Sequence, residues 1–337
     1  MPDGDPGLHR GLAGMTDIAR IEAAAGRLEG HVRRTPLLSA PGIDRIAGRR
    51  ILVKAECLQL TGSFKARGAW SAISALEPEA RARGILAYSS GNHAQGIAWA
   101  AAAHGVPAVI VMPSDAPGAK IAGTKSYGAE VVTYDRATEV REDIGRGIAA
   151  ERGMTLIPPY DHPDVIAGQG TVGLEIAAQA QEAGIAAADV LICCGGGGLS
   201  AGIALALAAK APDLRPRTVE PMGFDDMARS LAAGKPLRNA HLSGSICDAI
   251  LTPEPGTLTF PILHRYAGPG LTVTDAEARE AMALAFRHLK IVVEPGGAVA
   301  LAAALFRGEG IPGEAIIAVA SGGNVDGGFY AETVAGA

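Results

Sequence analysis

The chain repeats one pattern over most of its length: a short apolar run, a glycine turn and then residues at helical spacing. The apolar runs have the length and the β-branched content of buried strands. We expect strands at residues 51–55, 85–88, 108–112, 130–134, 190–193, 218–219, 291–293 and 316–320. Strands that alternate with helices form mainly parallel sheets with helices on both faces. The sequence therefore predicts an α/β fold.

Charge and hydropathy exclude several classes of protein. The 337 residues carry a net charge of −5 and form no basic patch, so we expect no nucleic-acid partner. No apolar run is long enough to cross a membrane, so we expect no membrane partner. The first residues lack the apolar centre of a signal peptide. We therefore expect a cytoplasmic protein in which residues 1–15 are a disordered extension.

The segment Thr-Gly-Ser-Phe-Lys-Ala-Arg-Gly-Ala at residues 61–69 places a lysine where a helix begins. It follows the strand expected at 51–55, and apolar residues recur at helical spacing after Lys65. A cation gains nothing from the helix dipole at this end. Lys65 is therefore either a solvated side chain or an amine of lowered pKa that forms a Schiff base.

Four consecutive glycines, residues 195–198, stand between an expected strand and an expected helix. Backbone N–H groups at such a turn bind phosphate, and the helix dipole adds to the attraction. The segment lacks the Lys-Ser/Thr pair of a nucleoside-triphosphate loop, and its spacing fits the dinucleotide fingerprint poorly. The run predicts a site for the phosphate of another kind of ligand.

Two further polar loops follow expected strands, Ser-Ser-Gly-Asn-His at 89–93 and Ser-Gly-Gly-Asn at 321–324. The first offers more donors than a helix N-cap needs, which indicates a cradle for a carboxylate or a cofactor oxygen. The second by itself predicts only a turn. Because ligands bind at the carboxyl ends of parallel strands, the three loops together predict one ligand crevice.

In this order, the four segments resemble the fold-type II pyridoxal-phosphate enzymes, specifically the threonine/serine dehydratase and serine racemase group. The resemblance runs from about residue 34 to residue 324 and includes family-like segments at 168–171 and 294–298. It implies two doubly wound open sheets of the tryptophan synthase β-like kind. It also implies a large cofactor domain at residues 16–69 and 158–337, and a small substrate-cradle domain inserted at 70–157.

The resemblance implies a role for each cofactor residue. Lys65 would hold pyridoxal 5'-phosphate as a Schiff base and then act as base on Cα. Ser321 would donate to the pyridine nitrogen, which leaves the ring a weaker electron sink than an aspartate would. Phe64 would pack against the ring, and Asn92 would bind its 3-oxygen. The phosphate would be held by Gly195, Gly196, Gly197, Gly198 and the N–H of Leu199.

The same resemblance places the substrate carboxylate on the loop at 89–93. The residues implied are Ser89, Ser90, Gly91, Asn92 and His93. Ser90 matches the position from which the racemase relatives act on Cα opposite the lysine. A second acid/base there would permit racemisation, but dehydratases carry the same pattern, so we expect dehydration as the main activity.

A divalent cation site is implied after the strand at 218–219. Its ligands would be Glu220, the carbonyl oxygen of Phe224 and Asp226, and such hard oxygen donors suit Mg²⁺ or Ca²⁺. The alternative is that the aspartates only cap the helix that follows.

The sequence thus predicts a homodimeric threonine/serine dehydratase (ammonia-lyase) that converts a β-hydroxy amino acid to a 2-oxo acid and ammonia. Enzymatic alternatives are an L-threo-3-hydroxyaspartate dehydratase, a serine racemase and a related dehydratase of compatible-solute catabolism. Arg141 could meet a second substrate carboxylate, although a solvated arginine is the ordinary state. Leu60 stands where ATP-regulated racemases have a basic residue, which argues against ATP activation. A non-catalytic phosphate- or nucleotide-sensing module and, last, a dehydrogenase are the readings from other classes.

Overall fold

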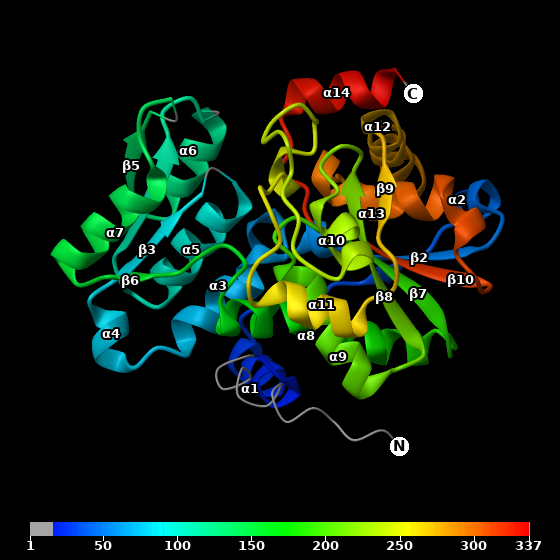
Figure 1. Cartoon of the computed structure of the whole chain (residues 1–337), viewed down its shortest axis with the longest axis horizontal. Helices are drawn as coiled ribbons and strands as arrows, with labels where there is room; N and C mark the ends of the chain where they lie inside the picture. The colour runs from blue at the N-terminus through cyan, green and yellow to red at the C-terminus, as the bar shows by residue number, and fades with distance from the viewer. Residues whose placement is uncertain (1–15, 90, 117, 136, 337) are drawn as a thin grey trace.

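Two sheets stand beside each other in the molecule, each with helices packed on its faces (Figure 1). The structure is a computed structural model that describes residues 16–89, 91–116, 118–135 and 137–336. The extension predicted at residues 1–15 lies outside these ranges. The predicted α/β fold with two sheets is confirmed.

The larger sheet has six strands in the order β1-β2-β10-β7-β8-β9. They are β1 (Leu37–Leu38), β2 (Arg50–Lys54), β10 (Ala315–Val319), β7 (Ala188–Cys193), β8 (Leu214–Pro221) and β9 (Leu271–Val273). β1 is antiparallel to β2, and all other pairings are parallel. The central strands are buried on both faces, which is why the sequence shows them as continuous apolar runs.

The smaller sheet has four parallel strands in the order β5-β4-β3-β6. They are β5 (Glu130–Tyr134), β4 (Ala108–Pro113), β3 (Ile85–Tyr88) and β6 (Thr155–Leu156). In Figure 1 this sheet lies on the left and the larger sheet on the right. The segment that forms it is inserted between β2 and β7 of the larger sheet. The domain boundaries at residues 70 and 157 remain a prediction.

Helices cover both faces of the larger sheet. α13 lies against β7, β8 and β10 on one face, and α9 lies against β7 and β8 on the other, with α8 beside it (Figure 1). α13 is buried on all sides, so it is apolar all round. The helices are α1 (Ile18–Leu28), α2 (Pro41–Ala47), α3 (Lys65–Ser74), α4 (Pro78–Ala82), α5 (Asn92–Ala103), α6 (Gly118–Ser126), α7 (Arg141–Arg152), α8 (Pro163–Glu182), α9 (Gly198–Lys210), α10 (Asp226–Ala233), α11 (Thr259–Tyr266), α12 (Asp275–Leu284), α13 (Pro295–Phe306) and α14 (Gly327–Ala335).

The strand predicted at residues 291–293 is wrong. This segment is an irregular link between a π-helical turn (Ala285–Leu289) and α13. Ile291 and Val293 are buried, so they fill the core without joining a sheet. Burial alone produced the strand-like pattern.

Within the described ranges, no helix combines the length and the hydropathy needed to cross a membrane. The homodimer and the cytoplasmic location remain predictions.

Candidate active site

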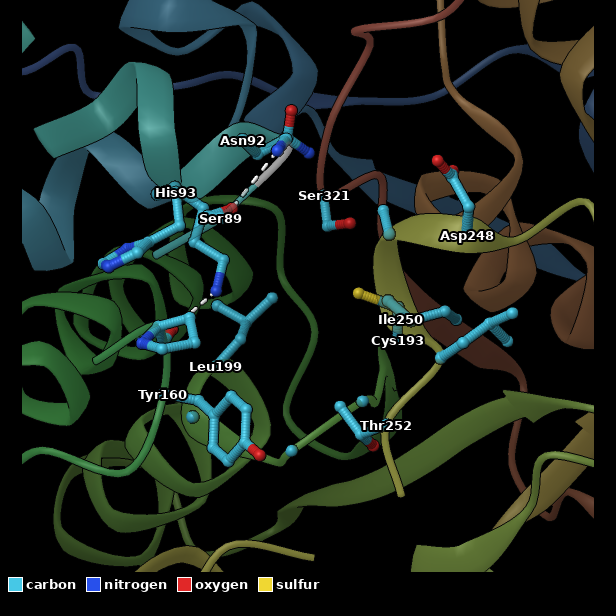
Figure 2. Close-up of a pocket in the computed structure, with 18 of the residues that line it drawn as sticks. Ser89, Asn92, His93, Tyr160, Cys193, Leu199, Asp248, Ile250, Thr252 and Ser321 are labelled. Atoms are coloured by element: carbon cyan, nitrogen blue, oxygen red, sulfur yellow. Dashed lines mark hydrogen bonds between the residues drawn. The ribbon is translucent and has the colours of Figure 1, made fainter. Parts of the chain in front are cut away.

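A cavity of about 190 Å³ lies between the two sheets, where β3, β7 and β10 end (Figure 2). All described residues of the predicted cofactor and substrate sets line it: Phe64, Lys65, Ser89, Gly91, Asn92, His93, Gly195, Gly196, Gly197, Gly198, Leu199 and Ser321. Ser90 lies outside the described residues. The crevice predicted from the three loops is therefore present, at the carboxyl ends of the strands.

Lys65 is the first residue of α3, and its amine reaches into the cavity. The amine donates a hydrogen bond to the Pro159 carbonyl oxygen at 2.6 Å and lies 5.2 Å from the centre of the Phe64 ring. Burial lowers the pKa of the Lys65 amine to about 8. A tenth or so of the amine is thus neutral at pH 7, far more than for an ordinary lysine, so Lys65 is a competent nucleophile and base.

The four glycines form a turn from which side chains are excluded. A Cβ at Gly196 would collide with the Tyr160 ring, and one at Gly195 would lie 3.0 Å from the Ile250 carbonyl oxygen. Gly197 has φ +91°, a conformation that favours glycine. The turn leads into α9, whose first N–H groups have no acceptor within the helix and face the cavity. This is an anion cradle.

On the small-sheet side, α5 begins with Asn92 and His93. The His93 ring nitrogen Nε2 lies 2.9 Å from the Ile157 carbonyl oxygen, so it carries the proton. Burial lowers the pKa of His93 to about 3, and the ring stays neutral. The ring therefore has no N–H left for a substrate carboxylate. The part of His93 that remains a candidate carboxylate donor is its backbone N–H at the start of α5.

Ser321 follows β10 and lines the wall opposite the small sheet (Figure 2). It is buried, and like the Cys193 thiol at the end of β7 it lines the cavity. Burial raises the pKa of the Cys193 thiol to about 11, so the thiol stays protonated. Both side chains present uncharged groups to the cavity.

Further lining residues carry chemistry beyond the predicted cofactor and substrate sets. Arg141 of α7 lines the cavity and donates to Glu142 Oε1 at 2.8 Å, while Lys120 of α6 pairs with Asp248 at 3.0 Å. Tyr160 also lines the cavity and packs on the glycine turn.

Glu294 is another lining residue outside the predicted sets. It is buried beside Asn92, and burial raises the pKa of this carboxyl to about 7. A glutamate just before a Pro-Gly-Gly helix start is the one signal in the sequence that could have indicated Glu294.

Of the predicted cation ligands, Glu220 has both carboxylate oxygens engaged in hydrogen bonds, whereas Asp226 Oδ2 is buried without a hydrogen-bond partner. Glu220 accepts hydrogen bonds from the backbone N–H groups of Met227 at 2.9 Å and Ala228 at 2.7 Å, so it caps α10. Asp226 Oδ1 accepts from Asn239 at 2.6 Å. In the part of the chain that the structure describes, no three His, Cys, Asp or Glu residues are grouped as metal ligands. The cation remains a prediction.

The cavity fits pyridoxal phosphate. The glycine turn offers an anion cradle without side chains, and Lys65 offers a buried amine for the aldehyde. Asn92 and Ser321 offer neutral hydrogen-bonding groups for the ring oxygen and ring nitrogen. The predicted residues could hold the group, and their individual roles remain predictions.

Comparisons with known proteins agree with this assignment. The model of the family described as "Pyridoxal-phosphate dependent enzyme" matches residues 28–322. An L-threo-3-hydroxyaspartate ammonia-lyase from Pseudomonas sp is 45% identical over 93% of this chain and 97% of that relative. The crystal structure of a T.th. threonine deaminase is 46% identical and covers 92% of this chain and 99% of its own, with a TM-score of 0.87. The structure of maize serine racemase is 37% identical in sequence, and the match covers 96% of this chain and 98% of the maize chain, with a TM-score of 0.89.

Proposed function

Because this chain belongs to the pyridoxal-phosphate dependent enzyme family, we propose that it is an ammonia-lyase acting on a β-hydroxy amino acid. The products are a 2-oxo acid and ammonia. The observation that carries the proposal is the position of the Lys65 amine, in one cavity with the glycine cradle and the start of α5.

The bound cofactor supplies an electron sink for the electron pair left when Cα loses its proton. The Lys65 amine takes that proton, because its lowered pKa suits a base near neutral pH. The N–H groups at the start of α5 orient the substrate carboxylate. The Cβ–O bond then breaks, and the hydroxyl leaves as water with the proton that the Lys65 amine took from Cα. The enamine product tautomerises to an imine, which one water molecule hydrolyses to the 2-oxo acid and ammonia.

Within this class, L-threo-3-hydroxyaspartate is the substrate that the charges of the cavity favour. Arg141 and Lys120 place two cationic side chains in the cavity wall. A second carboxylate on the substrate would find there the charge-assisted hydrogen bonds that an uncharged side chain cannot use. The name of the Pseudomonas relative supports the same choice.

The opposite observation favours L-threonine or L-serine. Arg141 is already paired with Glu142, and Lys120 with Asp248, so the chain's own carboxylates neutralise both cations. A neutralised wall suits an uncharged side chain, and the T.th. threonine deaminase supports this alternative. Racemisation would need an acid at Ser90, which lies outside the described residues.

Substitution of Arg141 separates the alternatives. The measurement is kcat/KM for L-threo-3-hydroxyaspartate, L-threonine and L-serine, read as 2-oxo acid formation, with D-serine formation followed in parallel. We expect Arg141→Gln to lower kcat/KM about ten- to hundredfold for the dicarboxylate and to leave L-threonine nearly unchanged, since a hydrogen bond to a charged group is lost only in the first case. Arg146→Gln, an exposed arginine of the same helix, is the matched control.

Each alternative outcome has a clear meaning. A wild-type enzyme that prefers L-threonine and is indifferent to Arg141→Gln would establish the threonine alternative. Formation of D-serine without 2-oxo acid would identify a racemase. A cofactor-loaded protein that converts none of the three amino acids would contradict the ammonia-lyase proposal.

A further inference from the structure

Asn92 is the middle member of a hydrogen-bonded row of three side chains, Asn324, Asn92 and Glu294, of which Asn92 and Glu294 line the cavity. Asn324 Nδ2 donates to Asn92 Oδ1 at 2.7 Å, and Asn92 Nδ2 donates to Glu294 Oε1 at 2.6 Å. At its far end, Asn324 Nδ2 also donates to the Thr61 carbonyl oxygen at 2.7 Å. This hydrogen-bonded row joins four parts of the fold: the loop before α3, the segment after β10, the start of α5 and the start of α13.

The direction of each hydrogen bond in this row of side chains follows from one backbone group. The Thr61 carbonyl can only accept, so the nitrogen of the Asn324 amide must face it. The second hydrogen of that nitrogen then requires an acceptor, so Asn92 presents its oxygen to Asn324. The nitrogen of Asn92 is thereby turned toward Glu294 and the cavity. This orientation follows from donor and acceptor chemistry and not from an arbitrary choice between the two amide atoms.

We propose that Glu294 and Asn324 are positioning residues that hold the Asn92 amide with its NH₂ group, and not its oxygen, toward the bound cofactor. One hydrogen of Asn92 Nδ2 is used by Glu294. The other is left for an acceptor in the cavity, such as the cofactor's ring oxygen. With the amide reversed, the Asn92 oxygen would face the Glu294 carboxylate, and these two acceptors would repel each other.

The surroundings of this row of side chains support a positioning role. Thr61 has φ 61°, an unfavourable conformation for a β-branched residue, and it is in this conformation that its carbonyl oxygen accepts from Asn324. Glu294 is 4% exposed, and a Cβ at Gly322 would collide with its Oε1. Glu294 also needs no particular charge for this task, because Oε1 accepts a hydrogen bond in both the ionised and the neutral carboxyl.

The role predicts an order of effects that loss of packing alone does not. In Glu294→Gln the amide oxygen still accepts from Asn92, whereas Glu294→Ala removes the acceptor. In Asn324→Asp the new carboxylate has no donor, so Asn92 must turn its nitrogen toward residue 324 and its oxygen toward the cofactor. Asn324→Asp should therefore be more harmful than Asn324→Ala, although it is the closer match in shape.

The experiment measures the dissociation constant of pyridoxal phosphate and the visible absorbance band of the cofactor-loaded protein, without substrate. We expect the dissociation constant to rise about tenfold in Glu294→Ala and more in Asn324→Asp, with a shifted band in both. Glu294→Gln should keep the wild-type band and bind within about threefold of wild type. Asp326→Asn is the control: it removes a charge near Asn324 but keeps the cap of α14.

Wild-type affinity and band in both Glu294→Ala and Asn324→Asp would overturn the proposal. So would a Glu294→Gln variant as impaired as Glu294→Ala. If Glu294→Ala does not fold, the comparison of Asn324→Asp with Asn324→Ala decides alone, and equal effects would contradict the proposal. Because the readout needs no amino acid, its outcome is independent of the substrate that the enzyme turns over.

Discussion

At the scale of single residues, the chemistry of the site depends on the removal of Lys65 from water. The lysine begins α3, where the helix dipole disfavours a cation, and its burial in the cavity wall disfavours the charged amine further. Both effects favour the neutral amine. The position of the lysine could be predicted from the sequence, and the structure adds the reason for its reactivity.

The pH dependence of cofactor attachment tests this reason. Only the neutral amine attacks an aldehyde, so the rate of attachment to the cofactor-free protein should rise with pH and level off above about pH 8, the lowered pKa of Lys65. An ordinary lysine would give a rate that still rises toward about pH 10. The measurement is stopped-flow absorbance after mixing with pyridoxal phosphate. Lys65→Ala should give no attachment at any pH, and a rate that keeps rising through about pH 9 would contradict the lowered pKa.

Whether a residue of the site could be predicted from the sequence depends on how far its partners lie along the chain. The loops at 61–69, 89–93 and 195–198 could be predicted because each carries its chemistry in one short segment. Asp248 could not, because it acts with Lys120, more than 100 residues away. For Glu294, whose partner Asn92 is also more than 100 residues away, the only signal is the Pro-Gly-Gly helix start that follows it. The orientation of His93 was also beyond prediction, since it depends on the carbonyl of Ile157.

At the scale of secondary structure, a buried ionic cluster fixes the helix that carries Lys65. Arg67 is 1% exposed and forms a two-point ion pair with Glu56, at 2.8 Å to each carboxylate oxygen. It also donates to Glu175 of α8 at 2.7 Å, and Lys54 of β2 reaches the same carboxylate at 2.5 Å. Two cations and two carboxylates thus join α3 to α8 and to β2.

We expect Arg67→Met to lower the free energy of unfolding by about 3–5 kcal/mol. The substitution leaves the fully buried Glu56 without its main partner, and an unpaired buried charge is costly. Urea unfolding of the cofactor-free protein measures the change. Arg34→Gln is the matched control, because the Arg34–Glu182 pair is exposed and should contribute less than about 1 kcal/mol. Equal losses in the two variants would show that the cluster is not a stabilising centre.

The close packing of α3 on α8 explains the Gly-Gln-Gly-Thr segment at residues 168–171, for which the sequence alone offered no structural reason. A Cβ at Gly168 of α8 would lie 2.5 Å from the Arg67 carbonyl oxygen, so the Gly-Gln-Gly-Thr segment lets α3 and α8 approach closely. Alternation of strands and helices was enough to predict the parallel sheets. Helix α8 was not predicted, because it is buried along much of its length and lacks a clear apolar stripe.

At the scale of the whole molecule, the cavity has walls on two sheets, so the relative position of the sheets sets its geometry. α6, beside the smaller sheet, carries Lys120, and a 3-10 turn at Asp248–Ile250 beside the larger sheet carries its partner Asp248. Both residues line the cavity. Their ion pair therefore links the two sides of the cavity.

We expect Lys120→Gln and Asp248→Asn each to raise KM by up to about fivefold, because a partly exposed ion pair contributes at most about 1 kcal/mol. Salt near 1 M should raise the wild-type KM by a similar factor, since the Debye length then falls to about 3 Å, and should leave both variants unaffected. Steady-state kinetics at low and high salt measure this.

If the pair only fixes the sheets, the two substitutions act alike on every substrate. If Lys120 instead leaves Asp248 to bind a substrate carboxylate, the two act in opposite directions on L-threo-3-hydroxyaspartate: Lys120→Gln raises KM, and Asp248→Asn lowers it by removing the competing carboxylate.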